Sequence, residues 1–221
     1  MMNNVFATLG AALLLPLSMA AQAASTECNN PSLIDTGNGT VIDRNTGLMW
    51  AQCSYGMVRE VDSASGEVSC VSDLDGNGDP VAFVMRTGTA LTDAAAATPS
   101  GYFATGGHTD WRVPNINELW SIVNDCSGVG TEGFVNPAYF PNQYSGYTPA
   151  YGSYPDHFAT STPIATGIIG NDDINTPISN ICLQMSGDKP LMGACQRNGY
   201  YLRLRLVRDV TVNDYASLPA R

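Results

Sequence analysis

The sequence predicts an α+β domain in which two helices pack on a small antiparallel sheet and long irregular loops connect the elements. Three observations favour this class. Short apolar runs alternate with turns of Asp, Asn and Gly; a capped, amphipathic helix follows the stretch DWRVP; and Gly (22) and Pro (13) are abundant while only 14% of the residues are charged. Such a composition is typical of many turns and long loops rather than of long helices.

The N-terminus predicts an export signal that is removed from the mature protein. Residues 5–20, VFATLGAALLLPLSMA, form an apolar run shorter than the roughly 20 residues of a spanning helix, and 21–23 have the Ala-x-Ala form of a cleavage site. Cleavage after residue 23 leaves about 198 residues, 24–221, enough for one domain. We therefore expect an exported protein (extracellular, cell-surface or periplasmic) with no membrane span.

Three segments predict strands. The apolar runs 40–42 and 48–50 surround a turn of sequence DRNTG, which indicates a β-hairpin. Residues 178–195 are compatible with a second hairpin that turns at GDKP, 187–190. Residues 201–206, YLRLRL, alternate strictly, which predicts a half-buried strand with Leu on one face and Arg on the other.

Two segments predict helices. The Ala-rich residues 81–97 are the first candidate, weakened by Gly88 and several Thr. The second follows Pro114: Asn115 caps it, and Glu118 stands three residues on, as in a capping box. Its apolar side chains recur at helical spacing and predict one buried face: Ile116, Leu119, Trp120, Val123 and Cys126.

Three separated stretches of the sequence stand out: DTGNGTVIDRNTGLMW (35–50), GGHTDWRVPNINELWSIV (106–123), and NPAYFPN with the terminal YYLRLRLVRD. Together they resemble one bacterial extracellular family, the Lcl C-terminal domain of a collagen-like adhesin, and the resemblance spans about 35–209. It implies a C-type-lectin-like fold, a secreted or surface role, and binding of carbohydrate or glycosaminoglycan in adhesion. The chain has no collagen repeats, so a collagen-stalk trimer is not implied and the oligomeric state stays open.

The central motif is best explained as scaffold. We expect Trp111 to fill the core beneath the second helix and Arg112 to pair with a carboxylate or a carbonyl oxygen. Leu119 and Trp120 then close over the same core.

Six cysteines follow the signal, and an even number in an exported chain favours disulfides over a zinc site. Cys53 with Cys70 closes a polar excursion at 53–82. Cys182 with Cys195 brackets the GDKP turn, which leaves Cys28 for Cys126. Six cysteines allow 15 connectivities. The pair Cys28–Cys126 therefore follows only from the assignment of the other four cysteines and has no support of its own.

The sequence DLDGNGD (73–79) places oxygen ligands at alternate positions, which suits Ca²⁺. The candidate ligands are Asp73, Asp75, Asn77 and Asp79. The twelfth position holds Val84 instead of the carboxylate of an EF-hand, so the segment is either a shorter calcium loop or a solvated turn.

A Tyr-rich stretch, 134–158, is the best candidate for ligand contact, because flat aromatic rings stack on sugars while their hydroxyls donate hydrogen bonds. The candidates are Tyr144, Tyr147, Tyr151 and Tyr154. The alternative is that these rings pack down to order a long loop.

The net charge of the protein limits the classes of ligand that we expect it to bind. Twenty acidic against 10 basic residues give a net charge of −10, which argues against nucleic acid and against unaided binding of polyanions. No catalytic constellation is readable in the sequence. We expect a non-enzymatic domain that binds glycans or extracellular matrix components, or alternatively an accessory subunit of a surface appendage that binds protein.

Overall fold

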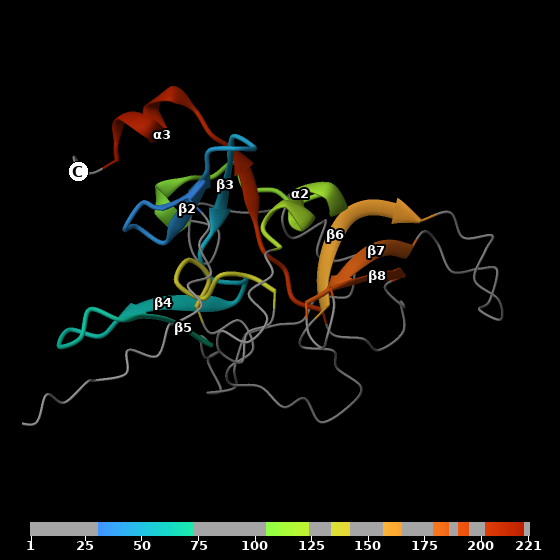
Figure 1. Ribbon diagram of the computed structural model, residues 1–221, viewed down its shortest axis with the longest axis horizontal. Helices are drawn as coiled ribbons and strands as arrows, with labels where there is room; N and C mark the ends of the chain where they lie inside the picture. The colour runs from blue at the N-terminus through green and yellow to red at the C-terminus, as the bar shows by residue number, and fades with distance from the viewer. Residues whose placement is uncertain are drawn as a thin grey trace, which may run out of the picture.

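The computed structural model of the protein describes seven parts of the chain: residues 31–72, 105–123, 134–141, 157–164, 179–185, 190–194 and 202–218. These residues form a small mixed domain with antiparallel sheets and two short helices (Figure 1). The predicted combination of helix and antiparallel sheet is therefore confirmed.

The strands form three sheets within these residues. The main sheet has the order β1-β2-β3-β9, with β1 at Leu33–Asp35, β2 at Thr40–Asp43, β3 at Leu48–Ala51 and β9 at Val207–Asp209. A separate hairpin pairs β4, Met57–Val61, with β5, Val68–Ser72. The third sheet has the order β6-β7-β8, with β6 at His157–Ile164, β7 at Ser179–Gln184 and β8 at Leu191–Ala194.

The two short helices are α2 at Ile116–Ser121 and α3 at Val212–Ala216, and η1 at Thr105–Gly107 is a 3-10 turn. Helix α2 contacts β6 and β7, whereas α3 stands apart from them near the end of the chain (Figure 1). The helix predicted at 81–97 lies outside the described residues. Helix α3 was not predicted.

Both predicted hairpins are confirmed. Strands β2 and β3 pair so that Val41 lies opposite Trp50, and the intervening turn ends at Gly47, whose φ of 69° suits glycine. Strands β7 and β8 pair antiparallel, with Cys182 opposite Gly193. The segment predicted as a polar excursion contains an ordered hairpin, β4–β5.

The main sheet is covered on both faces, because alternate residues of β2 and β3 enter two different hydrophobic clusters. Val41 and Trp50 join the first cluster, which includes residues of α2, β6 and β7; its buried members are Leu33, Val41, Leu48, Trp50, Ile116, Leu119, Ile122, Val135, Phe140, Phe158, Leu183, Met185 and Val207. Ile42 and Met49 join the second: Ile42, Met49, Ala51, Trp111, Val113, Leu204 and Leu206.

The prediction of a half-buried strand at 201–206 is wrong. Within the described residues 202–206, both the Leu and the Arg side chains are buried, and Arg205 is only 1% exposed. The segment runs between two neighbours: Arg203 exchanges backbone hydrogen bonds with the β6 region, and Leu206 accepts one from Ala51. The alternating pattern therefore places the Leu side chains in an apolar part of the interior and the Arg side chains in a polar part. Neither set faces solvent.

The start of α2 is confirmed and its buried face is corrected. Asn115 Oδ1 accepts from Glu118 N at 2.9 Å, and Glu118 Oε2 accepts from Asn115 N at 2.8 Å, which completes the capping box. Trp120, however, is 39% exposed, while Ile122 is fully buried. The helix ends at Ser121, so the buried arc is centred on Leu119 and leaves Trp120 at its edge.

Candidate functional site

The most unusual group in the described structure is the guanidinium of Arg205, which is buried between the main sheet and β6. Its Nη1 donates to Ala51 O at 2.7 Å and to Gln52 O at 2.6 Å, and its Nη2 donates to Ser54 Oγ at 3.4 Å. These acceptors lie where β3 leads into the β4–β5 hairpin. A buried arginine is tolerated when such acceptors replace its water.

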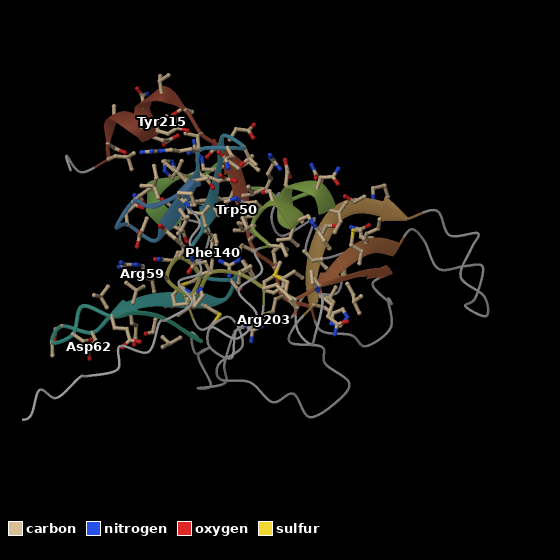
Figure 2. The ribbon with its side chains drawn as sticks, viewed as in Figure 1. Trp50, Arg59, Asp62, Phe140, Arg203 and Tyr215 are labelled. Atoms are coloured by element: carbon tan, nitrogen blue, oxygen red, sulfur yellow. A yellow bond between two sulfur atoms is a disulfide. The ribbon has the colours of Figure 1, made fainter. Side chains whose placement is uncertain are left out.

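Aromatic rings complete the environment of Arg205. Its Cζ lies 4.7 Å from the ring centroid of Phe140 and 5.9 Å from that of Phe158, within range of a cation–π interaction. Phe140 and Phe158 are themselves fully buried in the first core cluster. Phe140 and Phe158, which precede and follow the four candidate tyrosines in the sequence, thus contact a single arginine. Figure 2 labels Phe140 near the centre of the view.

A second polar cluster joins the central motif to β9. Arg112 donates to both oxygens of Glu118 at 2.8 Å and to Asp209 Oδ1 at 3.0 Å. Burial acts to raise the pKa of Glu118, but hydrogen bonds from Arg112 and from the Asn115 backbone lower it overall. The predicted pairing of Arg112 with a carboxylate is confirmed, and it fixes the capped start of α2 to the main sheet.

A third cluster holds α3 against the domain. Arg208 donates to Asp110 Oδ1 at 2.6 Å and to Asp214 Oδ2 at 2.8 Å, and His108 Nε2 lies 3.6 Å from Asp214 Oδ1. Burial acts to raise the pKa of Asp214, but hydrogen bonds from Thr211 and Arg208 outweigh it and lower the pKa to about 2. Asp214 is therefore ionised at neutral pH.

Trp111 and Leu119 are both buried, but in different hydrophobic clusters: Leu119 lies in the first and Trp111 in the second. The expectation that Trp111 fills the core beneath the second helix, together with Leu119, is therefore wrong, because the two side chains belong to separate clusters. Trp111 is 4% exposed, and its Nε1 donates to Thr105 O at 3.2 Å. Leu119 is fully buried. The ligand and metal candidates lie outside the described residues: Tyr144, Tyr147, Tyr151, Tyr154, Asp73, Asp75, Asn77 and Asp79.

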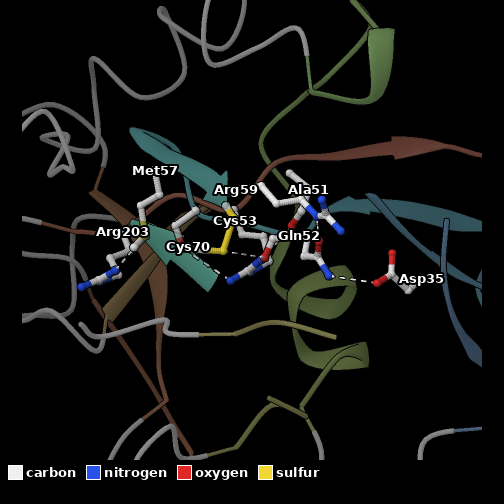
Figure 3. The surroundings of a disulfide bond; sticks show 10 residues. Asp35, Ala51, Gln52, Cys53, Met57, Arg59, Cys70 and Arg203 are labelled. Carbon is white, nitrogen blue, oxygen red and sulfur yellow. Dashed lines mark hydrogen bonds between the residues drawn. A yellow bond between two sulfur atoms is a disulfide. The ribbon is translucent and has the colours of Figure 1, made fainter. Parts of the chain in front are cut away.

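The cysteine predictions are confirmed in part. Cys53 and Cys70 form a disulfide with an S–S distance of 2.04 Å, at the base of the β4–β5 hairpin (Figure 3). Cys182 is disulfide-bonded too, but its predicted partner Cys195 lies outside the described residues, as do Cys28 and Cys126.

Two further observations concern the described ranges only. They contain no group of three or more His, Cys, Asp and Glu side chains arranged to hold a metal ion. None of their helices has the length and apolar character needed to cross a membrane.

Sequence reasoning missed the roles of Arg205, Arg208 and Asp214. One signal pointed to the two arginines: three of the ten Lys and Arg residues fall within 203–208, in a run otherwise rich in Leu and Val. In a chain with so few cations, arginines inside an apolar run indicate buried polar contacts.

Comparison with known proteins gives one match. No curated protein and no solved structure matches the chain. A family model described as the Lcl C-terminal domain matches residues 39–208. Its range includes the hairpin β2–β3, the capped helix α2, the arginines at the centre of both polar clusters, Arg112 and Arg208, and the buried Arg205. The match covers most of the sequence, so this chain belongs to the Lcl C-terminal domain family.

Proposed function

We propose that the protein is an exported, non-enzymatic binding domain whose ligand is a glycan or an extracellular matrix component, and that it acts in adhesion or envelope interaction. The proposal includes a C-type-lectin-like arrangement, in which a compact scaffold carries long binding loops. Membership of the Lcl C-terminal domain family supports it, as does a disulfide that suits an oxidising compartment.

The observation that carries the proposal is the shared anchorage of the Tyr-rich segment. Phe140 and Phe158 flank residues 142–156, and both rings contact the buried guanidinium of Arg205. A binding loop on a fixed base costs less conformational entropy when it takes a ligand. Tyrosines carried by such a base are suited to stack on the faces of sugar rings.

Ca²⁺ at Asp73, Asp75, Asn77 and Asp79 is part of the proposal for acidic ligands only. A protein of net charge −10 repels polyanions, and a bound cation would reduce that repulsion locally and could bridge to ligand oxygens. The four positions directly follow β5, which ends at Ser72. A neutral glycan read by the tyrosines needs no metal.

A glycan array probed with the purified protein, with and without EDTA, tests the proposal. We expect binding that falls about tenfold or more when Tyr147→Ala and Tyr151→Ala are combined, because stacking and hydroxyl contacts are both removed. Tyr215→Ala is the matched control, since Tyr215 is an exposed tyrosine on α3. An array without bound glycan, or a double variant that binds as tightly as the wild type, contradicts the proposal.

One observation favours the alternative, a structural or assembly subunit. Strand β8 lies at the edge of the third sheet and exposes Leu191 (55%) and Met192 (60%). Exposed apolar side chains on an edge strand suit contact with another protein. Capture of an envelope protein that is lost on Met192→Glu, together with an empty glycan array, would make this the better account.

A further inference from the structure

Arg59, on β4, is a half-buried arginine with unused hydrogen-bonding capacity. Its Nε donates to Gln52 Oε1 at 2.8 Å. Within the described part of the chain, its two Nη groups donate no hydrogen bond and meet no carboxylate, in contrast to Arg112 and Arg208. Arg59 therefore keeps a charged fork available for a ligand.

The side chain of Arg59 is held in place before any ligand arrives. Gln52 is fully buried, and its Nε2 donates to Asp35 Oδ2 at 3.3 Å, which fixes the amide with Oε1 toward Arg59 (Figure 3). The stem of Arg59 packs above Gly39: a Cβ added there would lie 3.4 Å from Arg59 Cδ and 3.5 Å from Thr105 Cγ2. Such pre-orientation reduces the entropy lost when a ligand binds.

A neutral donor lies on the turn whose Gly39 is packed beneath the stem of Arg59. Asn38, which precedes Gly39, is exposed, and its Oδ1 accepts from Thr36 Oγ1 at 2.5 Å and from Thr40 Oγ1 at 2.8 Å. The two hydroxyls hold the amide so that its Nδ2 remains the donor. A charged fork and a neutral amide that belong to packed neighbouring segments suit a ligand that carries one anionic group among hydroxyls.

We propose that Arg59 binds the single carboxylate of a sugar acid through its two Nη groups, with Asn38 Nδ2 donating to a neighbouring hydroxyl. A guanidinium fork matches the two oxygens of a carboxylate. The net charge of −10 repels further negative groups, so the site selects a monoanionic saccharide over a polyanion. This inference rests on the proposed function and names the ligand chemistry of a second contact point.

The test is an NMR titration of the ¹⁵N-labelled, disulfide-intact protein with sodium glucuronate, and in parallel with neutral glucuronamide. We expect glucuronate, and not glucuronamide, to shift the Nε–H signal of Arg59. Arg59→Met should weaken glucuronate binding about tenfold or more, and Arg59→Lys should weaken it less because the charge remains. Arg44→Met is the matched control, because Arg44 is exposed on the turn between β2 and β3.

Three results would overturn the inference: equal binding of glucuronate and glucuronamide, unchanged binding by Arg59→Met, or binding of acetate as tight as that of glucuronate. If Arg59→Met does not fold, the Nε–H shift in the wild type and the Arg59→Lys affinity decide. The tyrosine double variant reports on the proposed function and the Arg59 variants report on this inference, so the two failures are distinguishable.

Discussion

The two hairpins β2–β3 and β4–β5 have similar strand lengths but are stabilised in different ways. Every residue of β2 and β3 is buried, and the pair lies in the middle of two hydrophobic clusters. Strand β4 exposes Val58 (41%) and Val61 (49%), and its buried contacts are confined to a small cluster of Met57 with a disulfide. Figure 1 shows β4–β5 projecting from the rest of the domain.

The difference shows where the stability of this domain resides. The first hairpin is held by burial on both faces, which contributes about 25 cal/mol per Å² of apolar surface. The second has too little buried surface to be stable alone, since an isolated hairpin is marginal in water. A covalent bond at its base joins β5 to Cys53, and the hydrogen bonds of Arg205 to Ala51 and Gln52 hold the chain just before Cys53 to the core.

The largest expected effect is at Trp50. Trp50→Ala removes a fully buried indole from β3 and should lower the free energy of unfolding by about 3 to 5 kcal/mol. Val58→Ala, on the exposed hairpin, is the control and should change it by about 0.5 kcal/mol or less. Urea denaturation measures both. Similar midpoints for the two variants would show that the hairpins do not differ as described.

The disulfide should come next. Cys53→Ser combined with Cys70→Ser opens a loop whose ends are 17 residues apart, and we expect a loss of roughly 2 to 4 kcal/mol. Hydrogen exchange should rise first at the amides of β4 and β5, while those of β2 and β3 stay protected. Uniform loss of protection over both hairpins would contradict the comparison.

Helix α3 adds a third kind of stabilisation to the comparison. It is held to the domain by the ion pair of Asp214 with Arg208 rather than by apolar burial or a covalent bond. The folded pKa of Asp214, about 2, is below its ordinary value of 3.8, so its contribution is complete above pH 4 and is lost as the pH falls toward 2. Asp214→Asn should cost about 1.5 to 2 kcal/mol at pH 7. The gap between variant and wild type should close on acidification; a gap that is independent of pH would count against the ionised contact.

The smallest effect is expected at Trp120. Because it is 39% exposed at the edge of the α2 contact, Trp120→Ala should cost about 1 kcal/mol or less. Leu119→Ala, one residue earlier and fully buried, should cost about 2 to 5 kcal/mol. Thermal or urea unfolding of the pair checks the orientation of the helix, and a larger loss at Trp120 would reverse it.

Local patterns in the sequence predicted local structure well. The turn after Asp43, the capping box of Asn115 and Glu118, and the Cys53–Cys70 bond depend on residues close together in the chain. Arg205 could not be placed in this way, because its partners Ala51 and Gln52 are some 150 residues earlier. The alternating pattern in 201–206 is equally compatible with a strand that exposes one face to solvent and with a strand buried on both faces. Only the tertiary neighbours of the segment determine which of the two forms.

The contacts of Arg205 with Phe140 and Phe158 make the stability of the domain largely independent of the sequence between those two residues. Because Phe140 and Phe158 are fixed in the core, the fifteen positions between Pro141 and His157 can change in length or composition at little thermodynamic cost, since the closure entropy of a loop grows only slowly with its length. If the proposed function holds, ligand recognition can diversify at these positions while the fold stays constant. The same geometry makes residues 142–156 a natural position for grafting foreign sequences, with Arg205 and its two phenylalanines as the part to leave unchanged.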